Sequence, residues 1–270
     1  MACHSNPQRR PSTGSLDTPV IPAVELQGLT KRYGSRAAVD ALTLSLAAGT
    51  FVALLGPNGA GKSTLFQLLT GLFVADAGEA RIAGRSIRHD AVAALRHVGV
   101  VFQQPSLDLD LSVERNLRFH ADLHGLPRAV AGERIAAGCA ALGIDAERRR
   151  RVRELSGGTR RKVELVRALL HRPAVLLMDE ASVGLDPKSR RDLLAALRND
   201  VASRGSCVLW ATHLVEEAVT ADRVLVLHQG RLLADGTPAA VTAALGEATL
   251  EAGFIARTSA NTLLPGEPKS

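Results

Sequence analysis

The chain has 270 residues, enough for one large domain or two small ones, and 46% of them are hydrophobic, as in globular proteins with a sizeable core. Only 3% are aromatic, so this core must be built mainly from Leu, Val and Ala. The formal net charge of +6 is compatible with a nucleotide, a membrane surface or nucleic acid as partner, and requires none of them.

The three cysteines, Cys3, Cys139 and Cys207, form neither a disulfide framework nor a zinc-binding pattern. No segment offers the roughly 18 uninterrupted apolar residues that a membrane span requires. Residues 1–22 also lack the apolar core of a signal peptide. We therefore expect a soluble chain in a reducing compartment, with any membrane span supplied by another polypeptide.

The N-terminal part predicts a disordered arm followed by strands. Residues 1–22 are rich in Pro, Ser, Thr and Arg and show no periodicity. Alternating apolar residues then predict strands over 23–30 and 38–46, with a turn around Tyr33 between them. Tyr33 is the chain's one tyrosine, and two interpretations stay open for its ring: stacking on a purine base, or packing at a strand end.

A glycine-rich loop carries the strongest local signal. Gly56-Pro57-Asn58-Gly59-Ala60-Gly61-Lys62-Ser63-Thr64 fits the phosphate-binding pattern, between an apolar strand over 51–55 and a helix from Lys62 to about Leu72. Successive N–H groups at a helix N-terminus can converge on a phosphate. Lys62 would reach the β- and γ-phosphates, and the Ser63 hydroxyl would ligate Mg²⁺. The loop predicts a nucleoside triphosphate site.

Three later strands also end in polar residues. The strand over 98–102 ends at Gln103, whose amide is placed to ligate Mg²⁺ or to hold a water. The strand over 174–178 ends in Asp179, placed to hold Mg²⁺ through water, and Glu180, placed as the general base for an attacking water. His213 closes the strand over 206–211, and its place at a fourth such strand end favours function over structure.

Between residues 105 and 153 the pattern is helical. Ser112 is a good N-cap for a helix over 113–124. His120 and His124 share one face of that helix at a spacing that could bind metal, but no acidic or Cys partner accompanies them, so a solvated face is favoured. A serine and two glycines, Ser156-Gly157-Gly158, then precede a helix predicted over 160–171. Such a turn at a helix N-terminus can bind a second anion, although the motif alone is a weak signal.

The order of these motifs resembles the ATP-binding subunits of ABC transporters, over roughly residues 24–241. The matches are Tyr33 (adenine-stacking aromatic), Gly56 to Thr64 (Walker A), Gln103 (Q-loop), Ser156-Gly157-Gly158 (signature), Asp179 and Glu180 (Walker B and catalytic glutamate), Gly184-Leu185-Asp186 (D-loop) and His213 (switch). Two positions depart from the usual pattern: Thr159, where the signature most often has glutamine, and Ser182, where threonine is commoner.

The resemblance implies an α/β fold: a P-loop NTPase core whose mainly parallel sheet is flanked by helices, with an N-terminal antiparallel β subdomain and a helical insert. The ATPase domain would span residues 23–245, with the helical subdomain over about 105–165. Residues 246–270 would form a C-terminal tail.

The resemblance also implies ATP and Mg²⁺ as cofactors and assigns roles to single residues. Nucleotide contacts are implied for Tyr33, Gly56, Pro57, Asn58, Gly59, Ala60, Gly61, Lys62, Ser63, Thr64, Ser156, Gly157, Gly158 and Asp186. Catalytic roles are implied for Lys62, Gln103, Glu180 and His213, and metal ligation for Ser63, Gln103 and Asp179.

The implied assembly is a head-to-tail dimer of two copies around two ATP molecules, in which Ser156 and Gly158 act on the nucleotide of the other copy. A separate membrane permease would hold the dimer at the cytoplasmic face through the helical insert, with no nucleic acid partner. The segments 102–105 and 250–254 resemble exporter ATPases of the ABC-2 type, a subgroup with drug, polysaccharide and nodulation-signal exporters. Residues 102–117 also resemble ATPases associated with quinoprotein alcohol oxidation.

A soluble ABC-type ATPase of translation or DNA repair is the alternative function. Such proteins usually fuse two nucleotide domains or insert a long coiled coil, whereas this chain has one motif set and no heptad run. A nucleotide-binding module without turnover is disfavoured because Glu180 and His213 are both present. The sequence does not specify the cargo.

Overall fold

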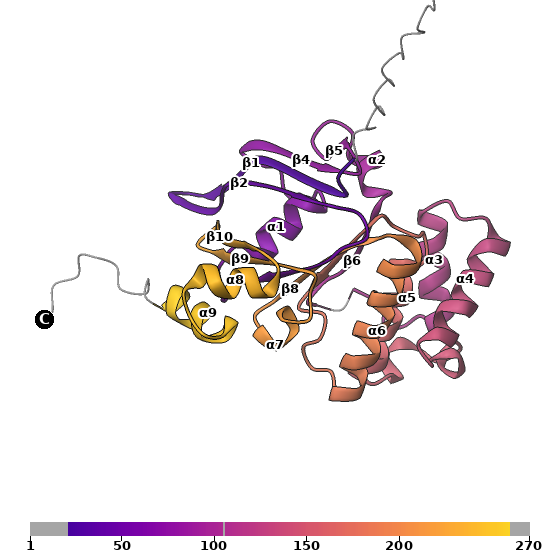
Figure 1. Ribbon diagram of the computed structural model, residues 1–270. Coiled ribbons are helices and arrows are strands. Elements are labelled where there is room, and N and C mark those ends of the chain that lie inside the picture. Colours follow the sequence, from indigo (N-terminus) through magenta and orange to yellow (C-terminus); the bar gives the residue numbers. More distant parts are fainter. Residues whose placement is uncertain (1–20, 105, 260–270) are drawn as a thin grey trace, which may run out of the picture.

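The computed structural model describes residues 21–104 and 106–259 (Figure 1). The predicted arm over residues 1–22 lies outside the described part except for its last two residues, as do residues 260–270 of the predicted tail.

Two β-sheets form the framework. The smaller is antiparallel, and its strand order is β2 (Arg36–Leu46), β1 (Val24–Tyr33), β4 (Ala77–Ile82), β5 (Arg85–Ser86). The larger has the order β10 (Arg231–Gly236), β9 (Arg223–His228), β3 (Phe51–Leu55), β8 (Cys207–Thr212), β7 (Val175–Asp179), β6 (Val98–Val101). All neighbours in the larger sheet are parallel except β10, which pairs antiparallel with β9. The predicted sheet architecture is confirmed.

Helix α1 (Lys62–Leu69) lies between the two sheets (Figure 1). Its buried residues Leu65, Phe66, Leu68 and Leu69 share one apolar cluster with both sheets. Apolar side chains buried in this way each contribute roughly 1.5–3 kcal/mol to folding. The cluster therefore holds the phosphate-binding loop, which directly precedes α1, in a fixed place.

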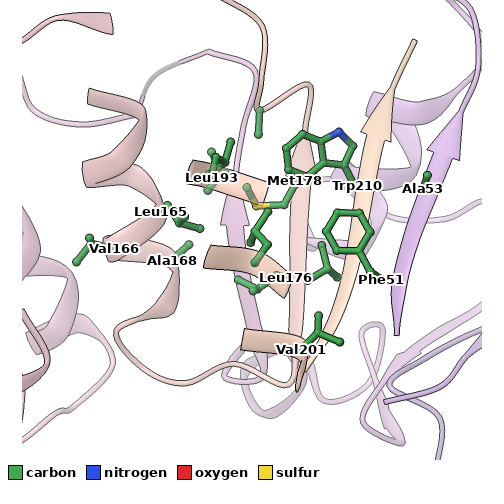
Figure 2. Packing of buried hydrophobic residues seen from close by; sticks show 14 of the residues in the cluster. Phe51, Ala53, Leu165, Val166, Ala168, Leu176, Met178, Leu193, Val201 and Trp210 are labelled. Carbon is green, nitrogen blue, oxygen red and sulfur yellow. The ribbon is translucent and has the colours of Figure 1, made fainter. Parts of the chain in front are cut away.

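The remaining helices lie mainly on the other face of the larger sheet. They are α3 (Val113–Leu123), α4 (Arg128–Ala141), α5 (Gly157–Leu169), α6 (Pro187–Arg204), α7 (Val215–Ala218), α8 (Pro238–Leu245) and α9 (Leu250–Ser259), while the short α2 (Ala91–Leu95) lies beside β4 and β5. Figure 2 shows Leu165 of α5 and Leu193 of α6 packed beside Met178 and Trp210 of the sheet. The predicted N-cap of α3 is confirmed, because the Ser112 hydroxyl accepts the Arg115 N–H at 3.3 Å.

Helix α1 ends earlier than predicted, at Leu69 instead of about Leu72. The Thr70 hydroxyl donates to the Phe66 carbonyl at 2.8 Å, and Gly71 adopts a left-handed φ of 69° that stops the helix. Leu72 and Phe73 are consequently exposed in a turn.

Helix α9 was not predicted; the sequence indicated only a weakening tail from Gly246. Gly246 has a left-handed φ of 80°, which ends α8 and turns the chain back. Leu250 and Phe254 are then buried, and a Cβ on Gly253 would lie 2.7 Å from the Leu245 Cβ, so the two helices pack closely. This stability comes from tertiary contact with α8, which local periodicity does not reveal.

Within the described residues, no single helix is long and apolar enough to cross a membrane. Helices α8 and α9 satisfy the length and composition together, but across a 46° bend.

Candidate nucleotide-binding and hydrolysis site

The phosphate-binding loop is packed tightly between strands of both sheets. Gly61 has a φ of 109°, and a Cβ there would lie 2.1 Å from the Ala38 carbonyl oxygen of β2. A Cβ on Gly56 would lie 2.6 Å from the Leu227 carbonyl oxygen of β9. Only glycine fits at these two positions, so the loop's path is fixed by its neighbours before any ligand is considered.

Lys62 lies inside this loop. Its side chain is buried, and Nζ donates to the Gly56 carbonyl at 2.6 Å and to the Pro57 carbonyl at 3.2 Å. Burial lowers the pKa of Lys62, and the neighbouring Glu180 and Asp179 carboxylates oppose that shift. An ammonium group held by backbone carbonyls at a helix N-terminus is well placed to receive a phosphate oxygen.

Asp179 ends β7 next to the first turn of α1. Burial raises the pKa of its carboxyl, and a hydrogen bond from Ser63 opposes the increase. Its Oδ1 is buried with no hydrogen-bond partner among the described residues. A buried, unpaired carboxylate oxygen beside a serine hydroxyl is the donor set that Mg²⁺ takes, so these residues fit the predicted metal.

Glu180 is held from two sides. Its Oε2 accepts the Gln103 amide N–H at 3.0 Å, and its Oε1 lies 3.0 Å from the His213 Nδ1. Its backbone has a φ of 47°, a left-handed conformation that costs a non-glycine residue about 1–3 kcal/mol. Such strain concentrates at active sites, and here it sets the direction in which the carboxylate leaves the strand.

The turn that carries His213 is anchored by a buried glutamate. The Glu217 Oε2 accepts the Thr212 hydroxyl at 2.6 Å and the Trp210 indole N–H at 3.0 Å. The Thr212 oxygen in turn accepts the Leu214 N–H at 3.0 Å. The end of β8 is therefore rigid on both sides of His213.

A buried ion pair that sequence reasoning missed joins α5 to the segment after β6. The Arg161 guanidinium donates to the Glu164 carboxylate at 2.8 Å, to the Phe102 carbonyl at 2.6 Å and to the Gln103 carbonyl at 3.2 Å. Glu164 also accepts the Ser106 N–H at 2.9 Å. The helix that begins at the Ser156-Gly157-Gly158 turn thus grips the backbone of Gln103. The one available signal was an Arg and a Glu three residues apart on a helix.

Breaking this pair is expected to destabilise the fold. Arg161→Met leaves the Glu164 carboxylate buried without its cation, and the free energy of unfolding should fall by about 3–5 kcal/mol. Urea denaturation measures the loss, with Arg191→Met, an exposed arginine on α6, as the matched control. A loss no larger than that of the control would contradict the importance of the pair.

Tyr33 lies at the end of β1, on the hairpin beside the loop. The residue is 48% exposed, and its ring makes an edge contact with the Phe73 ring at 6.1 Å between centroids. Arg36, across the turn, donates to the Gly59 carbonyl at 3.1 Å and so ties the hairpin to the phosphate-binding loop. The exposure of Tyr33 is compatible with base stacking, which stays a prediction.

The remaining predicted residues gather at a different place. Ser156 is exposed and caps α5 by accepting the Thr159 N–H at 3.2 Å, and Asp186 caps α6 by accepting the Lys188 and Ser189 N–H groups at 3.0 Å each. The two caps are neighbours, because a Cβ on Gly158 would lie 3.3 Å from the Ser189 hydroxyl. Over residues 21–104 and 106–259, no hydrogen bond or ion pair joins this pair of caps to the phosphate-binding loop.

Comparison with known proteins gives a consistent result. The ABC transporter family profile matches residues 39–183. The Nod factor export ATP-binding protein I of Ralstonia nicotianae is 38% identical over 232 residues, covering 86% of this chain and 71% of that protein. The probable multidrug ABC transporter ATP-binding protein YbhF of Escherichia coli is 35% identical over 221 residues, covering 82% of this chain but 38% of YbhF. A solved ATP-binding subunit of an ABC transporter superposes with a TM-score of 0.80 at 28% identity, covering 87% of this chain and 98% of that one.

The fold and the phosphate-binding loop define a P-loop nucleotide-binding protein, whose α/β core combines an antiparallel sheet with a mainly parallel one. The chain belongs to the ABC transporter family, as one of its ATP-binding subunits. It binds ATP and hydrolyses it to ADP and phosphate.

Proposed function

We propose that two copies of this chain close head to tail around two molecules of ATP with Mg²⁺, and that hydrolysis drives export through a separate membrane permease. Each nucleotide would lie between the phosphate-binding loop of one copy and the Ser156-Gly157-Gly158 turn of the other. One observation carries the proposal: the turn is exposed and unconnected to the phosphate-binding loop of its own chain within the described residues.

The exposed turn is suited to hold a phosphate from a second molecule. It opens α5, a helix of 13 residues, so its N-terminus carries partial positive charge and unpaired N–H groups. Gly157 has no atom within 4 Å of its Cβ position, which leaves the backbone accessible. The D-loop residue Asp186 lies beside it, so both would meet the partner on one surface.

Hydrolysis would proceed by in-line attack of water on the γ-phosphorus. Glu180 would accept the proton of the attacking water, while Gln103 and His213 hold its two carboxylate oxygens. The bond from phosphorus to the bridging oxygen breaks, ADP leaves, and the proton passes to the released phosphate or to solvent. Lys62 would place its positive charge against the β- and γ-phosphates as negative charge develops there.

Ser63 and Asp179 would hold Mg²⁺, with Gln103 as a further oxygen ligand, and the ion would neutralise charge on the β- and γ-phosphates. The buried, unpaired Oδ1 of Asp179 supports this assignment. Gln103 is predicted both to take part in catalysis and to ligate the metal, and these roles use different atoms of its amide. Its Nε2 donates to Glu180, and its Oε1 is the atom available to a metal.

Replacing His213 tests its predicted part in holding Glu180. His213→Ala should lower kcat by about 10- to 100-fold, because misplacing a reacting group by about 1 Å costs a similar factor. The affinity for ATP should stay unchanged, since His213 contacts the carboxylate and not the loop. Steady-state hydrolysis and equilibrium ATP binding separate the two effects. A positioning role would be contradicted if kcat and the affinity for ATP fell by the same factor, or if kcat did not fall.

Our proposals of export and of a membrane permease as partner are supported by the names of relatives. The two relatives described are named for Nod factor export and for a multidrug transporter, which supports export. The ATP that the chain uses is a cytoplasmic fuel, so we place the chain at the cytoplasmic face of the membrane. Co-purification with a membrane permease from detergent extract tests this part.

Dimerisation can be tested on the purified chain. With a non-hydrolysable ATP analogue and Mg²⁺, light scattering should report a dimer for the wild type. Ser156→Arg should stay monomeric, because the long arginine side chain at the exposed turn would fill the space that the partner's nucleotide needs. The variant Arg149→Ser, which changes an exposed arginine elsewhere, should dimerise like the wild type. A dimer that forms equally well with Ser156→Arg would refute the shared site.

A further inference from the structure

Three histidines meet where the helical insert packs against the core. His120 lies in the last turn of α3, His124 caps that helix, and His171 follows the end of α5. The ring centroids of His124 and His171 are 3.7 Å apart, those of His120 and His124 are 4.6 Å apart, and those of His120 and His171 are 5.8 Å apart. One ring nitrogen from each residue lies within 4.8 Å of the other two.

The hydrogen bonding leaves metal-binding nitrogens free. The His171 Nε2 is 3.0 Å from the Val98 carbonyl oxygen, which only accepts, so this nitrogen carries the proton and Nδ1 keeps its lone pair. That Nδ1 is buried without a partner among the described residues, and so is the His120 Nε2. A ring N–H donating to a backbone carbonyl while the other nitrogen is unpaired is the arrangement of a metal-bound histidine.

We propose that His120, His124 and His171 bind one late first-row transition-metal ion, with Zn²⁺ as the chosen probe, through three imidazole nitrogens and a water. Two histidines at positions i and i+4 of a helix with a third from another segment form a common zinc ligand set. Zinc–nitrogen bonds of about 2.1 Å require nitrogens about 3.4 Å apart. The His124 ring, now stacked on His171 with 12° between the ring planes, must turn about its side-chain torsions, because a metal ion lies in the plane of each imidazole that ligates it.

The charges and ligand atoms around the three histidines determine which ion can bind. Arg167 and Arg134 lie near the cluster, but their guanidinium groups are bound to Ser106 and to the Leu170 carbonyl. Mg²⁺ and Ca²⁺ require oxygen ligands, which this nitrogen cluster does not offer, whereas Zn²⁺, Cu²⁺ and Ni²⁺ accept imidazole. Burial lowers the pKa of His120 to about 3 and that of His171 to about 4, so both rings are neutral at pH 7, as metal ligands must be.

A bound ion would join three parts of the molecule. It would link the end of α3 to the end of α5 and, through the bond from His171 to Val98, to the start of β6. Strand β6 leads directly into Gln103. The ion would therefore clamp the helical insert to the strand that ends in the hydrolysis site, and it should raise the melting temperature of the chain.

The test is calorimetric titration of the full-length, nucleotide-free chain with Zn²⁺, followed by thermal melting. The wild type should bind one equivalent and melt at a higher temperature with the ion. His124→Gln should weaken binding by more than about tenfold, since even loss of an outer hydrogen-bond partner costs 10- to 100-fold. Circular dichroism and the metal-free melting temperature of His124→Gln must match those of the wild type, and His120→Gln gives an independent second variant.

Three controls separate this site from other zinc ligands in the chain. His89→Gln at an exposed histidine, His213→Ala in the hydrolysis site, and the double variant Cys3→Ser with His4→Gln should all retain the full equivalent. X-ray absorption of the zinc-loaded wild type should show nitrogen and oxygen ligands without sulfur. No binding by the wild type, unchanged binding by the folded cluster variants, or a sulfur ligand would each overturn the proposal.

Discussion

Glu180→Gln is expected to lower ATP turnover by about 10²- to 10⁴-fold, the usual contribution of a general base, and to leave ATP binding intact. The amide of glutamine keeps the size of the side chain and keeps one oxygen to accept the hydrogen bond from Gln103. It cannot take the proton from an attacking water. Bound ATP should then persist, and the two-copy complex should accumulate in its ATP-bound form.

Single-turnover hydrolysis and filter binding of ATP measure the two effects separately. Glu251→Gln, which makes the same change on an exposed residue of α9, is the matched control and should leave turnover unchanged. If Glu180→Gln turned over ATP nearly as fast as the control, the assignment of Glu180 as general base would be contradicted, whatever the effect on ATP binding.

Lys62→Ala and Ser156→Arg are each expected to abolish hydrolysis for different reasons. Lys62→Ala removes the buried ammonium group that the loop carbonyls hold, and losing such a charge contact costs about 10²- to 10³-fold. This variant should bind ATP poorly. Ser156→Arg should bind ATP normally, because its own phosphate-binding loop is unchanged, and should fail only at pairing. ATP binding by each isolated variant checks the contrast, and a binding defect in Ser156→Arg would place the turn beside its own chain's nucleotide.

Most of the framework around the site could be predicted because it depends on local patterns. Continuous apolar runs before Gly56, Gln103, Asp179 and His213 predicted strands, and the family resemblance implied that the sheet is mainly parallel. The carboxyl ends of parallel strands meet at one edge of a sheet. The structure brings the side chains of Gln103 and His213 to the two oxygens of Glu180 for this reason. The glycines of the loop marked the close approach of β2 and β9.

Features that depend on contacts distant in sequence could not be predicted. The left-handed backbone of Glu180 follows from the turn imposed after β7, and no pattern of residue types encodes it. The bonds from Arg161 to the Gln103 backbone join residues 58 positions apart. The sequence favoured a solvated face for the i, i+4 pair His120 and His124, and this was wrong. Both residues are half-buried and their rings pack against His171, which follows α5 and comes near only in the folded chain. For α9, burial against α8 supplies the stability that its sequence lacks.

The central claim is that one active site is shared between two copies, and mixing the two inactive variants tests it directly. In a head-to-tail dimer of Lys62→Ala with Ser156→Arg, one site carries both defects and the other carries none. Each mixed dimer keeps one intact site of two, so mixing should restore ATPase activity to at most about half that of the wild type, although neither variant is active alone. If instead each site were built within one chain, every site in the mixture would carry a defect, and the mixture would stay as inactive as its components.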